Sequence, residues 1–204
     1  MLKFVLFFVP KKQDKGRSLS SLCGLERSGR ETFFQYASDH KGVTVRKEIA
    51  SFVINGIQHE GLIESNMTLL ELLRDRLGLT GTKQGCAASG NCGACTVLVD
   101  GEPILSCLTL AATVKDRNIL TIEGLAQGTT LDPIQRAFID QGAVQCGFCT
   151  PGMILTAKHL LDHNPNPTRE EVKAGLAGNL CRCTGYVKIV DAVQAAAKMR
   201  NEKE

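Results

Sequence analysis

Cysteines are the residues of this 204-residue chain best suited to chemistry, and eight of the nine fall into two sets. The first cysteine set has the spacing Cys86-x5-Cys92-x2-Cys95-x11-Cys107. The second cysteine set consists of the pairs Cys146-x2-Cys149 and Cys181-x-Cys183. Thiolates grouped in this way hold zinc ions or iron–sulfur clusters. In a reducing compartment such groups bind metal more often than they form disulfides, so both sets are predicted to be metal sites.

The first set is nearest to the plant-type ferredoxin spacing C-x4-C-x2-C…C, which holds one [2Fe–2S] cluster. Three of its thiolates come from one loop, and Gly85, Gly90 and Gly93 allow that backbone to curl around a cluster. Backbone N–H groups of such a loop can donate hydrogen bonds to the sulfurs and help to set the potential. The first gap has five residues instead of four, and we expect the loop to absorb the extra residue as a bulge.

The second set is less specific, because C-x2-C pairs occur in both zinc and iron–sulfur sites. Spacing alone favours iron–sulfur over zinc for the first set and leaves the two about equal for the second. Cys149 and Cys183 each come just before an expected helix, whose N-terminus would stabilise a thiolate. The remaining cysteine, Cys23, has no partner at metal spacing and is interpreted as an unliganded thiol.

The elements before residue 124 form a small mixed sheet crossed by one helix. Asn55-Gly56 predicts a hairpin turn between strands at 51–54 and 57–63. Thr68 and Glu71 form a capping box that opens a leucine-rich helix closed by Gly78. A second hairpin is expected over 96–107, and a last strand over 118–122.

The elements after residue 124 are expected to be helical. Helices are predicted over 132–141, from a Thr150 N-cap to about His163, from the Thr168 capping box to about Gly178, and over 187–199. The apolar residues show no sustained period before residue 49, are arranged as in strands up to about residue 124, and have helical spacing after it. This pattern defines three segments. They are an irregular N-terminal extension at 1–48, a first cysteine domain at 49–124 and a second cysteine domain at 125–204.

Four motifs resemble a known family, and they agree with it in order and spacing over about residues 50–200. The motifs are Gly81-Thr-Lys-Gln-Gly-Cys86, Cys92-Gly-Ala-Cys-Thr96, Gln145-Cys-Gly-Phe-Cys-Thr-Pro-Gly152 and Gly178-Asn-Leu-Cys-Arg-Cys-Thr-Gly-Tyr186. They resemble the iron–sulfur small subunit of molybdenum hydroxylases, the xanthine dehydrogenase and aldehyde oxidase family. The resemblance is greatest to separate bacterial small subunits of the 4-hydroxybenzoyl-CoA reductase, nicotinate dehydrogenase, xanthine dehydrogenase and carbon monoxide dehydrogenase types.

The resemblance implies an α+β protein in which a β-grasp, plant-type ferredoxin-like [2Fe–2S] domain precedes an all-α four-helix-bundle [2Fe–2S] domain. It implies that Gln145 and the Cys183 thiolate lie against a molybdopterin. The cluster nearer the flavin would be held by Cys86, Cys92, Cys95 and Cys107. The cluster nearer the molybdopterin would be held by Cys146, Cys149, Cys181 and Cys183.

The implied function is that of a non-catalytic subunit of an oxidoreductase complex, carrying electrons between molybdopterin and FAD. A molybdopterin-binding large subunit and an FAD-binding medium subunit are the expected partners, in a heterotrimer or a dimer of it. Two alternatives remain at this point. One is a free-standing ferredoxin-type carrier, and the other is a zinc-stapled interaction module without a redox role.

Charge and hydropathy exclude other classes of function. The formal net charge is +3, but residues 1–48 hold ten Lys/Arg against five Asp/Glu, whereas the rest holds fourteen against sixteen. A nucleic-acid partner is therefore not expected, nor is a membrane, because no apolar run is long enough to span one. A cytoplasmic protein is expected. His159 and His163 are spaced i,i+4 without a third ligand, so they are interpreted as a solvated helix face.

Overall fold

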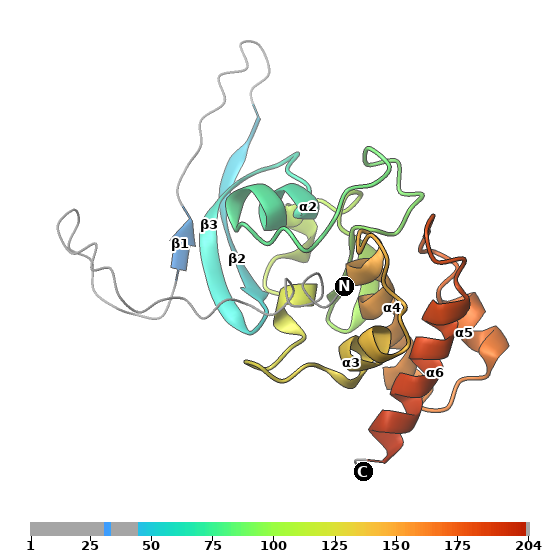
Figure 1. Ribbon diagram of the computed structural model, residues 1–204. Coiled ribbons are helices and arrows are strands. Elements are labelled where there is room, and N and C mark those ends of the chain that lie inside the picture. Colours follow the sequence, from blue (N-terminus) through green and yellow to red (C-terminus); the bar gives the residue numbers. More distant parts are fainter. Residues whose placement is uncertain (1–30, 34–44, 203–204) are drawn as a thin grey trace.

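A mixed sheet and a group of helices pack side by side in the computed structural model, which describes residues 31–33 and 45–202 (Figure 1). The strands are β1 (Glu31–Phe33), β2 (Lys47–Ile54), β3 (Ile57–Glu64), β4 (Thr96–Val99), β5 (Glu102–Leu105) and β6 (Asn118–Leu120). The α-helices are α2 (Leu69–Glu71), α3 (Pro133–Asp140), α4 (Thr150–His163), α5 (Arg169–Gly175) and α6 (Val187–Asn201). The shorter helical turns are η2 (Leu72–Arg76), η3 (Ala111–Val114) and η4 (Ile122–Gly124). The α+β class is confirmed.

The sheet has six strands in the order β1-β3-β2-β6-β4-β5, with antiparallel hairpins β2–β3 and β4–β5 and parallel pairs β1–β3 and β2–β6. The predicted turn at Asn55-Gly56 is confirmed, and both residues have positive φ, as a tight hairpin turn requires. The Asn55 side chain also accepts a hydrogen bond from the Thr121 N–H at 2.9 Å. This bond ties the hairpin to the end of β6.

The helix beside the sheet begins as the sequence predicts and then widens. Thr68 and Glu71 form the expected capping box, with the Glu71 carboxylate 2.8 Å from the Thr68 N–H. From Leu72 onward the turn is a π-helix, in which the Leu77 N–H donates to the Leu72 carbonyl at 3.1 Å. The leucines of α2 and η2 pack with the sheet in one core, which includes Phe52, Ile54, Leu69, Leu72, Leu73 and Val97.

The expectation of an irregular segment over 1–48 is wrong for the part of it that the structure describes. Strand β1 pairs in parallel with β3, and β2 begins at Lys47, opposite Glu64. The backbone groups on the outer side of β3 offer an edge on which a further strand can pair. Cys23 lies outside the described residues.

Several predicted helix ends differ from the structure by one to three residues, among them the start of α4 and the end of α5. The N-cap of α4 is Cys149 and not Thr150, because the Cys149 carbonyl accepts the first helical bond, from the Met153 N–H at 3.0 Å. Helix α5 ends at Gly175, before the predicted Gly178. Beyond that end, the Asn179 side chain donates a hydrogen bond to the Gly93 carbonyl at 2.8 Å.

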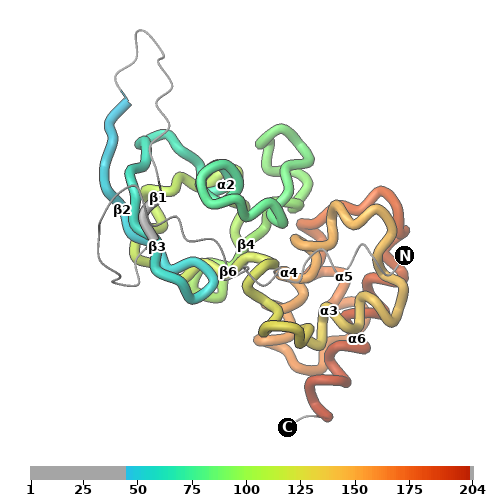
Figure 2. Tube along the Cα trace, turned by 60° about the vertical axis from the view of Figure 1, so that its left-hand side comes forward, coloured from blue at the N-terminus to red at the C-terminus, as the bar shows by residue number. Residues whose placement is uncertain are grey.

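Helices α3 to α6 share a second core, and α4 joins it to the sheet. The core includes Ile134, Phe138, Met153, Leu161, Val172, Ile189 and Val193. Figure 2 shows α4 beside the part of the sheet that contains β4 and β6. Gly152 on α4 lies so close to the Gly93 carbonyl that a Cβ on Gly152 would clash with that oxygen. Among the described residues, no helix is long and apolar enough to cross a membrane.

Candidate metal centres

The first cysteine set meets at one end of the sheet. Cys86 and Cys92 lie in the loop before β4, Cys95 directly precedes that strand, and Cys107 follows β5. The thiols of Cys86 and Cys92 contact each other, as do those of Cys95 and Cys107. Cys95 and Cys107 are buried against Leu70, which lies on α2. The fold therefore brings together all four cysteines of this set.

The extra residue in the first gap is absorbed by a tight turn instead of the expected bulge. Ser89 donates its backbone N–H to the Cys86 carbonyl at 3.1 Å. Ala87 has a φ of 49° and Ala88 a φ of 61°, so two consecutive alanines adopt the left-handed conformation. That conformation is unfavourable for residues with a Cβ. The loop is thus curled tightly at some cost in backbone energy.

The same loop stabilises a thiolate at Cys86, as expected of a backbone that wraps a sulfur. The pKa of Cys86 is lowered to about 6 by the Ser89 hydroxyl and by the backbone N–H groups of Cys92 and Asn91. The pKa of Cys107 is instead raised to about 11, by burial and by the adjacent Cys95 thiol. The set therefore combines one sulfur that is readily anionic with one that resists ionisation.

The second cysteine set is assembled from two loops. Cys146 and Cys149 precede α4, whereas Cys181 and Cys183 lie between α5 and α6. The Sγ atoms of Cys146 and Cys183 are 3.5 Å apart, and the Cys149 thiol contacts that of Cys181. Burial opposes ionisation of Cys181, but hydrogen bonds from the hydroxyl and N–H of Thr184 lower its pKa.

The expected stabilisation of thiolates by helix N-termini is wrong for this set. Although Cys149 caps α4, its pKa is raised to about 12 by burial and by the neighbouring thiols of Cys181 and Cys146. The pKa of Cys183 is also raised, first by its contact with the Cys146 thiol. Burial of the Cys149 thiol and the contacts among the thiols both favour the neutral form here.

Each set has the composition and environment of a metal–sulfur centre. All eight of these cysteines are free of disulfides. Burial and neighbouring thiols raise the pKa of Cys107 and Cys149, and only a positive centre makes four thiolates stable together. A donor set of four sulfurs suits a [2Fe–2S] cluster or zinc. The residues therefore fit the clusters that the spacing predicts.

Hydrogen bonds join the two sets directly. Leu180, which precedes Cys181, donates its N–H to the Cys92 carbonyl at 2.9 Å. The buried Asn179 side chain donates to the Gly93 carbonyl and accepts from the Thr156 hydroxyl at 2.9 Å. Sequence reasoning gave no role to Asn179, although it lies inside one of the four motifs. Only its burial between two loops reveals the role.

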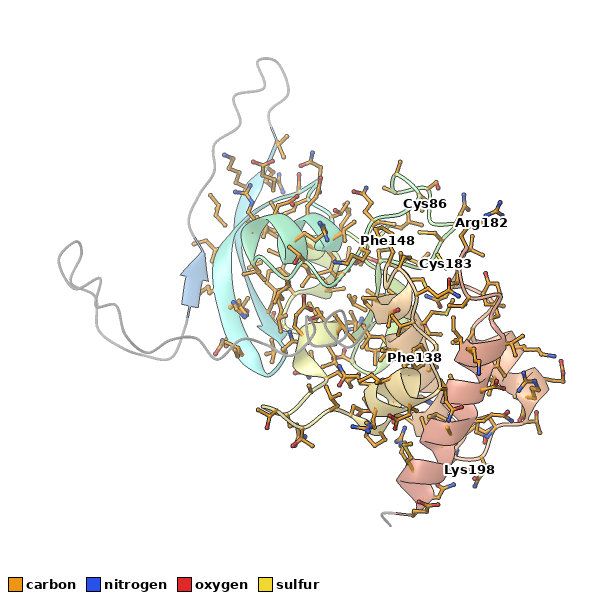
Figure 3. The ribbon with its side chains drawn as sticks, in the orientation of Figure 1. Cys86, Phe138, Phe148, Arg182, Cys183 and Lys198 are labelled. Atoms are coloured by element: carbon orange, nitrogen blue, oxygen red, sulfur yellow. The ribbon has the colours of Figure 1, made fainter. Side chains whose placement is uncertain are left out.

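An aromatic side chain also lies between the sets. A Cβ on Gly85 would meet the Phe148 ring at 3.1 Å and the Cys92 sulfur at 3.2 Å. Phe148 belongs to the loop of the second set, yet it packs on the loop of the first. Figure 3 shows Cys86, Phe148 and Cys183 at the same end of the molecule, with Lys198 far from them.

The second set is open to solvent on one side. Gln145, Cys146 and Cys183 are all exposed. Large apolar side chains are exposed in the loops of this set and in the first turn of α6. They form what we call the apolar rim, made of Phe148, Leu180, Tyr186 and Val187. Leu180, Tyr186 and Val187 of the rim line one pocket, and exposed apolar side chains of this kind are typical of a surface that contacts another protein.

Known proteins match this chain over both sets. A family described as "2Fe-2S iron-sulfur cluster binding domain" matches residues 52–126, and one described as "[2Fe-2S] binding domain" matches residues 121–194. The nicotinate dehydrogenase small FeS subunit of Eubacterium barkeri is 50% identical over 145 residues, which are 71% of this chain and 92% of that protein. The chain belongs to the iron–sulfur small subunits of the xanthine dehydrogenase family.

Further relatives agree with this assignment. The xanthine dehydrogenase iron-sulfur-binding subunit of Escherichia coli O157:H7 is 50% identical over 149 residues, covering 72% of this chain and 92% of that one. In the crystal structure of quinoline 2-oxidoreductase from Pseudomonas putida 86, one chain matches with a TM-score of 0.73 and 47% identity. The match covers 78% of this chain and 98% of that chain. This chain is accordingly an iron–sulfur electron-transfer subunit with two [2Fe–2S]-binding domains.

Proposed function

We propose that this subunit carries electrons between a molybdopterin on a large partner subunit and FAD on a medium partner subunit, in a heterotrimer or a dimer of it. In this proposal each cysteine set holds one cluster, and the chain contributes no catalytic residue. The first cluster, nearer FAD, is held by Cys86, Cys92, Cys95 and Cys107. The second, nearer the molybdopterin, is held by Cys146, Cys149, Cys181 and Cys183.

The observation that carries the proposal is the direct connection between two groups of four free thiols. A bound [2Fe–2S] cluster supplies one-electron redox chemistry. The chain's own task is to hold the sulfurs at fixed separation, and the bond from Leu180 to the Cys92 carbonyl does this between the sets. Eight free thiols also favour a reducing compartment, and we infer the cytoplasm.

The outward side of the second set supports its position nearer the molybdopterin. Gln145 and Cys183 are exposed there, and the apolar rim lies in the same loops and the adjoining turn of α6. A surface of this kind favours a built-in subunit over the free-standing ferredoxin, which needs no permanent partner face. We infer that Gln145 and Cys183 contact the pterin when the large subunit covers this surface.

The fold supports a division close to residue 124. We propose a β-grasp ferredoxin-like domain over 49–124 and a helical domain over 125–204, in which α3 to α6 form a four-helix bundle. The shared core of these four helices supports the bundle. Residues 1–48 are assigned to an N-terminal extension, of which β1 and the first residues of β2 pair with β3.

Iron, acid-labile sulfide and zinc per chain, with low-temperature EPR of the dithionite-reduced protein, test the proposal. Two clusters give equal iron and sulfide and two distinguishable spin-half signals. A single signal with half of the iron would contradict the two-cluster assignment. Zinc without sulfide would overturn the redox function and support the zinc-stapled module instead.

The role of Gln145 is tested by Gln145→Ala in the assembled complex. We expect both clusters to remain, because the side chain is exposed and outside both cysteine sets. The rate of electron transfer from molybdenum to the second cluster should fall severalfold, measured by rapid-freeze EPR after mixing with substrate. An unchanged rate would remove Gln145 from the contact with the pterin.

A further inference from the structure

Three side chains capable of binding a metal meet where the β4–β5 hairpin contacts α4, away from both cysteine sets. They are Glu102, His159 and His163, and one ligand atom from each lies within 4.8 Å of the other two. The expectation that the two histidines have no third ligand beside them is therefore wrong, although His163 is exposed as a solvated face requires. The third ligand comes from a strand more than fifty residues away in the sequence, which only the fold brings close.

We propose that Glu102, His159 and His163 bind one divalent cation of the Zn²⁺ class, which clamps the β4–β5 hairpin to α4. Two imidazoles and a carboxylate are a ligand set that zinc uses with a water molecule in the fourth position. The site holds no sulfur, so its chemistry differs from that of the cysteine sets. The cation would be structural and would take no part in electron transfer.

The His163 ring is oriented as a metal ligand should be. Its Nδ1 lies 2.9 Å from the His159 carbonyl oxygen, so the Nδ1–H donates to that carbonyl. The lone pair is then on Nε2, which faces the Glu102 carboxylate at 3.9 Å. Histidines that bind metals typically donate their other ring N–H to a carbonyl or carboxylate in this way.

The His159 ring contacts the turn of the β4–β5 hairpin. Its Nδ1 lies 3.0 Å from the Gly101 carbonyl oxygen, in the hairpin turn, and 4.0 Å from the Glu102 carboxylate. Nδ1 is the ring nitrogen shown near the Glu102 carboxylate, so His159 must turn its ring or give up this hydrogen bond to bind a cation. The two imidazole rings have centroids 4.3 Å apart and pack against each other, and one ligand atom of each lies within 4.8 Å of the other and of Glu102.

Little movement is needed to close these ligands on an ion. Zinc binds nitrogen and oxygen at about 2 Å, which places the ligand atoms of a tetrahedral site roughly 3.3 Å apart. The Glu102 side chain is 67% exposed and so has room to turn toward the two imidazoles. The His159 side chain is 25% exposed and so has less room to move than Glu102.

A cation at this position would connect the β4–β5 hairpin, which leads to Cys107 of the first set, with α4, which begins beside Cys149 of the second set. The hairpin carries Glu102, and the helix carries both histidines. The cation would thereby join the two regions at the end of α4 opposite to the Gly152 contact. The proposal is independent of which cysteines hold which cluster.

Calorimetric titration of the cluster-loaded full chain with ZnCl₂ tests the site. We expect one saturable equivalent, with iron and sulfide unchanged by the titration. The double variant His159→Gln/His163→Gln should lose this binding, and Glu102→Gln should weaken it at least tenfold. Glu170→Gln is the matched control, because Glu170 is an exposed carboxylate on α5, and it should bind Zn²⁺ like the wild type.

Hydrogen exchange provides a second measurement. It reports local protection at the proposed site, which Zn²⁺ bound elsewhere in the chain would not change. Zn²⁺ should slow exchange in the β4–β5 turn and the last turn of α4 in the wild type, but not in the double variant. Equal Zn²⁺ affinity in the double variant would overturn the proposal. So would the absence of saturable binding to the wild type, or binding that occurs only with loss of iron.

Discussion

The two cysteine sets reach the same ligand chemistry by different structural routes. The first set comes from one continuous segment, residues 86–107, in which a curled loop and a hairpin bring the thiols together. The second set needs two loops with 31 residues between them, held together by the packing of α4, α5 and α6. One site is thus built by turn geometry, and the other by helix packing.

The two sets also differ in how their sulfurs are stabilised. In the first, the loop itself lowers the pKa of Cys86 with backbone and hydroxyl donors, while Cys95 and Cys107 are buried. In the second, Cys146 and Cys183 are exposed, and burial with crowding raises the pKa of Cys149. A local site can thus be closed on itself, whereas a site between helices can be left open toward a partner.

The largest expected effect is the loss of one cluster without the other. Cys149→Ser should remove half of the iron and one EPR signal, because a serine oxygen is a poor replacement for a thiolate on iron. Cys95→Ser should remove the other signal. Iron analysis and EPR of both variants provide the measurement.

Cys23→Ser is the matched control for both variants, since Cys23 belongs to neither set, and it should keep all of the iron. Loss of both signals in either cluster variant would show that the sites are not independent.

A smaller but still severe effect, a loss of folding stability, is expected from substitution of Gly93, where the loops of the two cysteine sets are in contact. Its φ is +67°, and a Cβ would clash with the Gly178 carbonyl and the Asn179 side chain. Gly93→Ala should lower the free energy of unfolding by roughly 3 kcal/mol or more, from strain and overpacking together. Urea unfolding followed by circular dichroism measures it.

The control for Gly93→Ala is Gly142→Ala, because Gly142 also has a left-handed φ but nothing lies within 4 Å of its added Cβ. It should cost only the backbone strain, about 1 kcal/mol. Equal losses in the two variants would mean that the contact between the loops adds nothing.

The side chain that bridges the sets should matter somewhat less. Asn179→Ala leaves the buried Gly93 carbonyl and Thr156 hydroxyl without this partner, at a cost of about 2 kcal/mol. Asn201→Ala, which removes an exposed amide bonded to Asn166, should change stability little. Similar melting temperatures for the two variants would argue against Asn179 as a bridge.

The smallest effect, and the only stabilising one, is expected in the curled loop of the first set. Ala87 is exposed and has a left-handed φ, so Ala87→Gly should relieve strain and gain about 0.5 kcal/mol. Ala174→Gly, on an exposed face of α5, should instead lose about 1 kcal/mol. Rates of cluster loss to a chelator at raised temperature compare the two, and a faster loss in Ala87→Gly would contradict the strained loop.

The sequence by itself determined many of the features that depend on neighbours in the chain. The Asn55-Gly56 turn, the Thr68 and Thr168 capping boxes and the β4–β5 hairpin follow from backbone preferences and short-range hydrogen bonds, and the structure contains all of them. The grouping of the first cysteine set was also readable, because ligand spacing within a loop is a local property, whereas the second set was grouped through the resemblance of its motifs to a known family.

Only the tertiary structure decided which distant residues meet. The contact between Cys146 and Cys183, the bridge made by Asn179 and the approach of Glu102 to the α4 histidines each join segments far apart in the chain. The pairing of β1 with β3 is of the same kind. Such contacts depend on the packing of whole elements, and no periodicity or local spacing specifies them.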